Sequence, residues 1–430
     1  MRSNSAPGVP MLAALLYVAL IMPPEFSLTV GGLRLSTYRV LLLLVTVPLM
    51  LRLMQNRYQP PNAVDWLIMA HAAWAVIALS IFGGLGAGIE SGGIYAVESL
   101  GAYLVGRLTV TSAEEHRALL HFMVALLAGM ALLTLPESLT GTHFIREAAR
   151  AVMGGPGLPI IEPRLGLDRA FGSFDHPILY GVFASSTFAA AYYVLNRERL
   201  GARAVAVLGL IMGSTFLSLS AGPFVGLACQ AMLIGWDRFT KGISLRWSAI
   251  FGLIMLAWFA VSLGSNRSPI KVFISYVAFS PESAYNRVLI WEYGTAEVGR
   301  HPLFGIGLGD WIRAPWMSDS MDNFWLVTAV RYGMPALAFL LAAIVTLAVR
   351  QVRVSSRDVV LNRHRMAWLV IVIGFTISGF TVHFWNSLFA YFFFLIGSGA
   401  WLAHPQRRRC TRRPPVLLPL HVQQFQAAAT

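Results

Sequence analysis

Residues 323–349 read NFWLVTAVRYGMPALAFLLAAIVTLAV, a largely apolar run in which Arg331 is the only charged residue. A helix of this length can cross the hydrocarbon core of a bilayer, which is about 30 Å thick. Similar runs recur along the sequence, so we predict an all-α polytopic integral membrane protein with about twelve transmembrane helices. The predicted spans lie near residues 9–29, 38–54, 63–82, 93–110, 118–136, 177–195, 203–219, 221–236, 247–264, 323–349, 366–382 and 385–403.

The composition supports the same class of protein. Of the 430 residues, 56% are hydrophobic and 12% are charged, and the mean hydropathy is +0.63. These values lie outside the range of soluble globular domains. Residues 1–403 are therefore predicted to form a single transmembrane domain, followed at 404–430 by a basic, partly disordered cytoplasmic tail.

The net charge of +13 is explained by membrane topology rather than by nucleic-acid binding, because the basic residues concentrate in short segments between the apolar runs. With both termini in the cytoplasm, every cytoplasmic loop is basic, as the positive-inside rule requires. The two cysteines, Cys229 and Cys410, lack metal-ligand spacing, so no metal site is predicted.

Two long extracytoplasmic loops, residues 137–176 and 265–322, follow from this topology, and function is expected in them. Basic residues outside oppose the insertion bias, so a basic set there suits an anionic ligand at the membrane surface. The alternative is that these side chains extend to lipid phosphates. The outward basic set comprises Arg146, Arg150, Arg164, Arg169, Arg267, Lys271, Arg287, Arg300 and Arg313.

In the second loop, Ser280-Pro281 is typical of a helix start, and the helix is expected to end near Gly299. Arg287 and Trp291 are one turn apart on this helix and share a face. An apolar stripe that includes Trp291 predicts a helix lying flat at the membrane interface, with Arg287 at headgroup depth. A purely structural interfacial helix is the alternative.

Polar residues also stand at the membrane edges. Asp322-Asn323 marks the point where the chain re-enters the membrane, where an acid serves either as a helix cap or as a general base. Arg331, inside the following span, is expected to face a polar cavity. In the first loop, Arg169 and His176 lie at the membrane edge, where a structural histidine is commoner than a binding site.

In the order and spacing of these motifs, the sequence resembles the O-antigen ligase and polysaccharide polymerase superfamily over roughly the fifth to the tenth predicted span. Each motif is weak alone, and their shared order makes the resemblance fairly specific. It rests on Arg169-x-x-Gly172-x-Phe174-x-His176-Pro177, Ser218-x-Ser220, Arg287-x-x-x-Trp291, His301-Pro302-x-x-Gly305-x-Gly307, and Asn323-x-x-Leu326 followed by Gly333.

The resemblance implies a metal-independent glycosyltransferase that uses neither a nucleotide nor another cofactor. It would act at the outer face of a bacterial inner membrane, among membrane lipids. Its donor would be an undecaprenyl-diphosphate-linked glycan, and its acceptor a hydroxyl on a glycan or on lipid A core. Arg169 and Arg287 match the family's loop arginines that bind the donor diphosphate, because a guanidinium fork suits phosphate geometry.

Two positions depart from the family pattern. The family often has His-Asn where this chain has Asp322-Asn323, so Asp322 is expected to be the catalytic base. His176 and His301 are its rivals, and both are expected to bind substrate, as is Asn323. The family's arginine after the Ser-x-Ser turn is Ala221 here.

Arg331 is expected to replace that arginine at the donor. A secondary transporter or a lipid-linked sugar flippase is the alternative function, and it predicts ionisable residues inside several spans. Asp65, Glu98 and Arg331 are the clear candidates for such residues.

Overall fold

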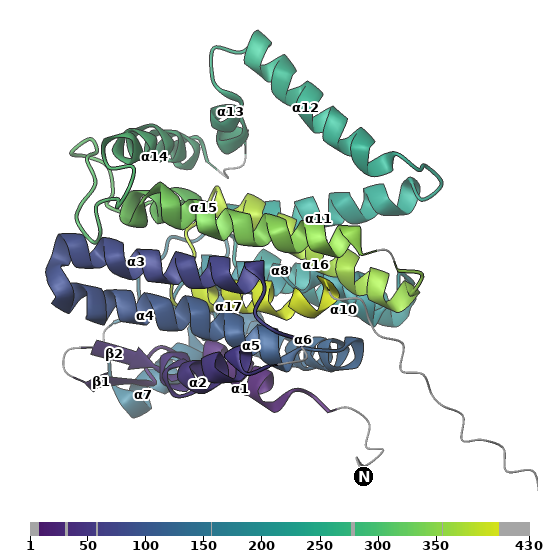
Figure 1. Cartoon of the computed structure of the whole chain (residues 1–430), viewed down its shortest axis with the longest axis horizontal. Helices are drawn as coiled ribbons and strands as arrows, with labels where there is room; N and C mark the ends of the chain where they lie inside the picture. Colours follow the sequence, from purple (N-terminus) through teal and green to yellow (C-terminus); the bar gives the residue numbers. More distant parts are fainter. Residues whose placement is uncertain are drawn as a thin grey trace, which may run out of the picture.

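The computed structural model describes residues 8–30, 33–56, 59–155, 157–276, 280–354 and 356–403, and it shows an all-α membrane protein with one small β-hairpin. The predicted tail at 404–430 lies outside the described residues. Figure 1 shows the long helices stacked as a bundle whose axes run across the view. In the described chain, eight helical runs are long and apolar enough to cross a membrane: Thr37–Met54, Ala63–Thr109, Ala113–Thr140, Pro177–Leu195, Arg246–Gly264, Phe324–Arg353, Val359–Gly379 and Asn386–Ala403.

These runs are built from α-helices joined in places by short π-helical segments, at 88–92, 97–101 and 191–195, and by a 3₁₀ turn at 400–403. The α-helices are α1 Met11–Ile21, α2 Thr37–Met54, α3 Ala63–Ala87, α4 Gly93–Ala96, α5 Ala102–Thr109, α6 Ala113–Thr140, α7 Phe144–Met153, α8 Pro177–Ser185, α9 Phe188–Ala190, α10 Ala202–Leu217, α11 Ala221–Phe239, α12 Arg246–Gly264, α13 Pro269–Tyr276, α14 Pro281–Arg300, α15 Phe324–Arg353, α16 Val359–Gly379 and α17 Asn386–Ser398.

The run Ala63–Thr109 covers the predicted span 63–82 and all but the last residue of 93–110, and it folds back on itself at Gly84. Gly84 has φ 76° and ψ 176°, a conformation that glycine adopts readily because it has no Cβ. A Cβ on Gly92 would lie 3.0 Å from the Cα of Val76. The two arms of this run therefore pack against each other at close range.

The first predicted span, 9–29, is shorter than expected. Helix α1 ends at Ile21, before Pro23 and Pro24, which lack the amide hydrogen that a helix needs. Strand β1 (Ser27–Val30) then pairs antiparallel with β2 (Leu33–Ser36). Helices α1 and α10 are too short to be counted among the eight runs, so the number of about twelve spans stays a prediction.

The core surrounds α17, in which every residue from Ser387 to Ser398 is buried. Phenylalanine rings dominate it: the ring centroids of Phe375 and Phe392 are 5.6 Å apart, and those of Phe324 and Phe392 are 5.4 Å apart. Such contacts add to the free energy gained from burial. This packing holds α15, α16 and α17 against one another.

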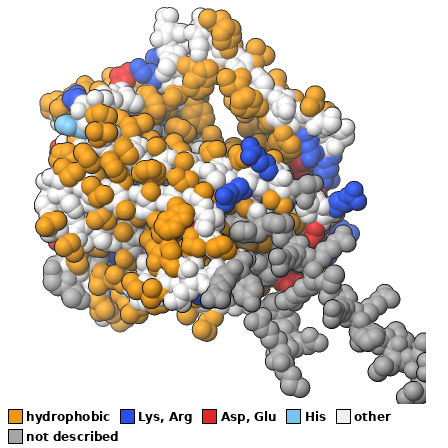
Figure 2. Space-filling view, viewed as in Figure 1, with side chains coloured by type: hydrophobic (Ala, Val, Ile, Leu, Met, Phe, Trp, Pro, Cys, Tyr) orange, Lys and Arg blue, Asp and Glu red, His pale blue; other side chains and the backbone are white. Residues whose placement is uncertain are grey.

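Helix α12 stands apart from the bundle. None of its residues is buried, although it is apolar around its whole circumference. Figure 1 shows it as a diagonal rod that is connected to α11 at one end and to α13 at the other. Figure 2 shows hydrophobic side chains over most of this face and an opening between α12 and the bundle. An apolar surface of this kind is suited to contact with lipid.

Candidate functional site

Most of the ion pairs made by the outward basic set involve carboxylates of the same loops. Arg169 and Arg287 differ from these pairs. Each is only 8% exposed, and neither has a carboxylate within ion-pair distance among the described residues. The paired members are Arg146 with Glu25, Lys271 with Glu292, Arg300 with Glu297, and Arg313 with Asp310.

The Ser-x-Ser turn between α10 and α11 holds Arg169. Its Nη2 donates a hydrogen bond to Ser220 Oγ at 2.7 Å, and its Nε donates to the Ser218 carbonyl at 3.4 Å. Arg164 Nη1 donates to the carbonyl of Leu219, in the same turn, at 3.0 Å. The turn therefore places two guanidinium groups close together. Burial, with the nearby charge of Arg164, lowers the pKa of Arg169 to about 10.

Helix α14 supplies Arg287. Ser280 Oγ caps the helix by accepting a hydrogen bond from the Ser283 amide at 3.2 Å, which confirms the predicted helix start. The buried face of α14 contains Arg287, Ile290 and Gly294 and packs on α15; it is not the predicted stripe through Trp291. Nε and Nη1 of Arg287 are buried and have no hydrogen-bond partner among the described residues.

Asp322 lies near both arginines. Burial raises the pKa of its carboxyl group, and the positive charges of Arg287 and Arg169 oppose that rise. Asp322 is not the cap of α15. Asn323 is, because its Oδ1 accepts from the Leu326 amide at 3.0 Å, while its Nδ2 donates to the Phe380 carbonyl at 3.2 Å. The side chain of Asn323 is thus engaged in holding the fold.

The three remaining predicted residues fall in different places. His176 caps α8 through Nδ1, which accepts from the Ile178 amide at 3.2 Å; burial, with Arg169 and then Arg164, lowers its pKa to about 4. His301 is exposed, 3.6 Å from a Glu297 oxygen, and about 20 Å along α14 from Arg287 by helix geometry. The structure therefore does not bring His301 to the arginines.

Arg331 is exposed and follows the first turns of α15. Two residues later α15 is interrupted at Gly333, where φ is 82° and ψ is 168°. The positive charge of Arg331 acts on His383, and it adds to burial in lowering the pKa of that histidine to about 3. Arg331 therefore acts on His383, whereas Arg169 and Arg287 are the residues that act on Asp322.

The first loop is held in place by buried polar contacts. A carboxylate oxygen of Glu137 accepts from the Phe171 amide at 2.9 Å, and the other accepts from the Gly172 amide at 3.1 Å. Arg146 pairs with Glu25 and donates to the Phe174 carbonyl at 2.8 Å. These bonds fix the backbone between Arg169 and His176.

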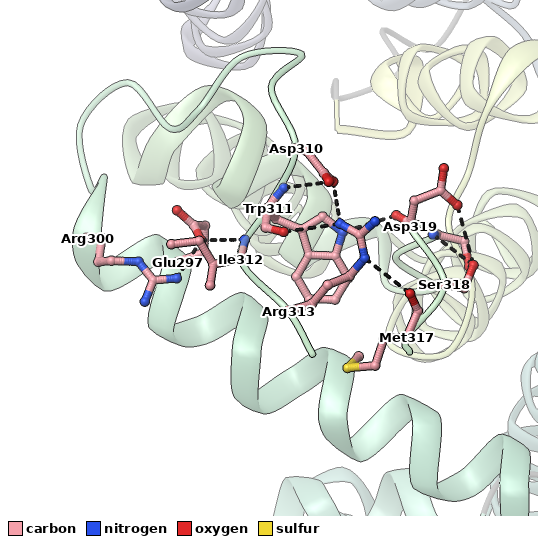
Figure 3. A network of polar contacts seen from close by, with 10 residues as sticks. Glu297, Arg300, Asp310, Trp311, Ile312, Arg313, Met317, Ser318 and Asp319 are labelled. Carbon is pink, nitrogen blue, oxygen red and sulfur yellow. Dashed lines mark hydrogen bonds and ion pairs between the residues drawn. The ribbon is translucent and has the colours of Figure 1, made fainter. Parts of the chain in front are cut away.

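The second loop is ordered by the network of polar contacts in Figure 3. The carboxylate of Glu297 accepts hydrogen bonds from Arg300 at 2.5 Å and from the Ile312 amide at 3.1 Å. Trp311 Nε1 donates to the Asp319 carbonyl at 3.1 Å. The chain is therefore anchored on α14 before it reaches Asp322.

Arg164 and His383 belong to this region but were not predicted as site residues. Arg164 was visible only as a member of the outward basic set. His383 lies in the turn between α16 and α17, and this turn pairs with the start of α15, because the Phe324 amide donates to the Val382 carbonyl at 3.0 Å. A histidine in a short turn between two spans was the available signal. Its proximity to Phe324 could not be read from the sequence.

Within the described residues, His, Cys, Asp and Glu side chains do not gather in groups of three or more that could hold a metal ion. Comparison of the chain with protein-family models gives no match, and comparison with curated proteins gives none either. The resemblance to the O-antigen ligase and polysaccharide polymerase superfamily therefore stays a prediction. It rests on the quoted motifs, several of which meet at the site formed by Arg164, Arg169, Arg287, Asp322 and His176.

Proposed function

We propose that the protein is a membrane glycosyltransferase that joins a glycan from an undecaprenyl-diphosphate-linked donor to an acceptor hydroxyl. The observation that carries the proposal is the pair of buried arginines, Arg169 and Arg287, which have no carboxylate within ion-pair distance among the described residues. A buried charge without a close partner is strongly unfavourable. A diphosphate would supply the negative charge that both guanidinium groups lack, and acceptor oxygens for the unpartnered Nε and Nη1 of Arg287.

The reaction needs a base and a stabilised leaving group. The carboxylate of Asp322 would accept the proton of the acceptor hydroxyl as that oxygen bonds to the anomeric carbon of the donor sugar. The bond from the anomeric carbon to the diphosphate oxygen breaks, and its electron pair leaves with the diphosphate. Arg169 and Arg287 would stabilise the charge that develops there. The raised pKa of Asp322 makes it a stronger base than an ordinary aspartate.

The opening beside α12 suits a lipid-linked donor. No residue of α12 is buried, and its exposed large apolar side chains include Phe251, Leu256 and Phe259. Figure 2 shows hydrophobic side chains around the opening on this face. A polyprenyl chain could remain in apolar surroundings there while its diphosphate reaches the arginines.

The proposal includes a topology. Both termini would be cytoplasmic, the membrane would be the inner membrane of a bacterium, and residues 137–176 and 265–322 would form two extracytoplasmic loops among about twelve spans. Labelling of intact cells with a membrane-impermeant maleimide tests it in a protein lacking Cys229 and Cys410. Ile160→Cys and Arg267→Cys should react, and Gly242→Cys should react only after the cells are opened.

The transport alternative depended on ionisable residues inside the spans. Two of these residues are held in ion pairs: Asp65 lies 3.1 Å from Arg107 Nε, and Glu98 lies 2.6 Å from Arg39 Nε. Asp65 also closes a capping box at the start of α3. Such pairs connect neighbouring helices, and this favours a structural role for both carboxylates over an ion path.

Reconstitution tests the function. The purified full-length protein in lipid nanodiscs is mixed with undecaprenyl-diphosphate-linked glycan and either a glycan or a lipid A core acceptor, without metal or nucleotide. Acceptor-dependent release of undecaprenyl diphosphate is the expected result, and the size of the product separates ligation from polymerisation. Movement of the lipid-linked glycan between leaflets of a liposome, with no release, would instead support the flippase.

A further inference from the structure

A row of rings extends from the candidate site along the turn between α16 and α17. Phe324 stacks on His383 at a centroid distance of 6.3 Å, His383 stacks on Trp385 at 6.0 Å, and Trp385 lies 5.7 Å from His176. His176, His383 and Trp385 are half-buried. The row joins two loops that are distant in sequence.

A polar contact fixes the relative position of these loops. Asn386 Nδ2 donates a hydrogen bond to the Asp175 carboxylate at 2.9 Å. Asn386 directly follows Trp385, and Asp175 directly precedes His176. The hydrogen bond between Asn386 and Asp175 therefore keeps the rings of Trp385 and His176 close together. Asn386 has φ 51°, a left-handed conformation that asparagine tolerates better than most residues. The turn is thus built in one specific shape.

The polar atoms of the row are mostly those of neutral donors and acceptors. Nδ1 of His176 accepts a hydrogen bond, so the proton of the neutral ring is on Nε2, which can act as a donor. Nδ1 of His383 is buried and has no hydrogen-bond partner among the described residues. Buried polar atoms are nearly always hydrogen-bonded, so we expect this nitrogen to form a hydrogen bond with a bound ligand. The carboxylate of Asp175, which directly precedes His176, is engaged by Asn386.

Flat apolar faces combined with neutral hydrogen-bonding groups suit a sugar ring, which has apolar C–H faces and hydroxyls at its rim. The end of the row at His176 lies seven residues after Arg169 in the first loop, whose backbone between the two is fixed by Glu137 and Arg146, and Arg169 and Arg164 both act on the pKa of His176. A sugar on the row would therefore be adjacent to a diphosphate on Arg169 and Arg287.

We propose that His176, His383 and Trp385 form a sugar subsite that binds the first sugar of the donor, the one attached to the diphosphate. This inference rests on the proposed function. Trp385 would stack on the face of the ring, and His383 Nδ1 would pair with a hydroxyl. The subsite would thereby distinguish a glycan-bearing lipid from undecaprenyl diphosphate itself, which is the product that must leave.

Equilibrium binding to the full-length protein in nanodiscs tests the inference. The probes are undecaprenyl diphosphate and the same lipid linked to glucose, galactose or N-acetylglucosamine, with the best-bound sugar used for the variants. Wild-type protein should bind the sugar-linked probe more tightly. Trp385→Leu should raise the dissociation constant of the sugar-linked probe about tenfold and change that of undecaprenyl diphosphate by no more than about twofold. Trp385→Phe should keep part of the preference for the sugar-linked probe. His383→Asn should act in the same direction.

The controls separate this inference from the proposed function. Trp316→Leu removes a tryptophan that is 64% exposed and outside the row, and it should change neither affinity. Arg287→Ala should weaken both probes; if it weakens neither, the proposed function fails even where a sugar preference remains. Equal binding of both probes by the wild type, or an equal loss of both in folded Trp385→Leu, would overturn the sugar subsite.

Discussion

Arg287 and Asp322 act on each other across the site, although one lies on α14 and the other precedes α15. Burial raises the pKa of Asp322, and Arg287 is the stronger of the two arginines that oppose this rise. Burial likewise lowers the pKa of Arg287, and the carboxylate of Asp322 opposes that change. Each group therefore favours the ionised form of the other, and replacing Arg287 should raise the pKa of Asp322 further.

Replacing Arg287 should abolish most of the transfer activity. Arg287→Ala removes a buried guanidinium that would form charge-assisted hydrogen bonds with the donor diphosphate, so we expect the rate to fall by about two orders of magnitude. Arg287→Lys should recover a small part of the lost rate, because an ammonium group carries the charge but lacks the paired N–H donors of a guanidinium group. Release of undecaprenyl diphosphate is the measurement. Arg267→Ala, an exposed member of the outward basic set, is the matched control and should keep the wild-type rate.

The ionisation of Asp322 should determine how the transfer rate depends on pH. The ionised carboxylate is the active base, so the rate should fall as pH decreases through its pKa, which burial places above the ordinary value of 3.8. Removing the positive charge in Arg287→Ala should shift this acid limb of the residual activity to higher pH. Asp322→Asn should lower kcat about a hundredfold or more with little change in donor affinity. An unchanged kcat in Asp322→Asn would rule out Asp322 as the base.

Glu137 is expected to position the first loop. Glu137→Ala leaves the amides of Phe171 and Gly172 buried without their acceptor, so we expect a loss of about 1–3 kcal/mol in the free energy of unfolding and weaker donor binding. Glu137→Gln keeps an oxygen acceptor, so its free energy of unfolding and its donor affinity should lie between those of the wild type and of Glu137→Ala. Thermal unfolding in detergent and donor binding measure these effects. Glu162→Ala, at an exposed position of the same loop, should behave as wild type.

Gly333 should tolerate no side chain. Its φ of +82° strains any other residue, and a Cβ there would lie 1.9 Å from the Leu303 carbonyl oxygen. Gly333→Ala should therefore destabilise the protein by at least about 2 kcal/mol, seen as a lower melting temperature in detergent. Gly129→Ala is the control, because a Cβ at that helical position meets nothing within 4 Å. Equal melting temperatures for both variants would show that the break in α15 can relax.

Much of the architecture could be predicted because transmembrane helices are specified locally. A run such as 323–349 must satisfy its backbone hydrogen bonds within itself in lipid, so apolar length alone predicts a helix. Local caps were equally readable: Ser280 and Pro281 start α14 as expected. The first predicted span, 9–29, extends past the end of α1 at Ile21, because Pro23 and Pro24 cannot continue the hydrogen bonding of a helix.

The site depended on information that the sequence does not carry locally. The sequence by itself determined which residues lie in the loops, including Arg169, Arg287 and Asp322. Only the tertiary structure decided that Glu297 and Asp310 pair with other arginines of the basic set, that Asn323 rather than Asp322 caps α15, and that His301 lies at the far end of α14. The physical reason is that apolar burial specifies a helix through its own residues, whereas an electrostatic site arises where the ends of distant helices meet.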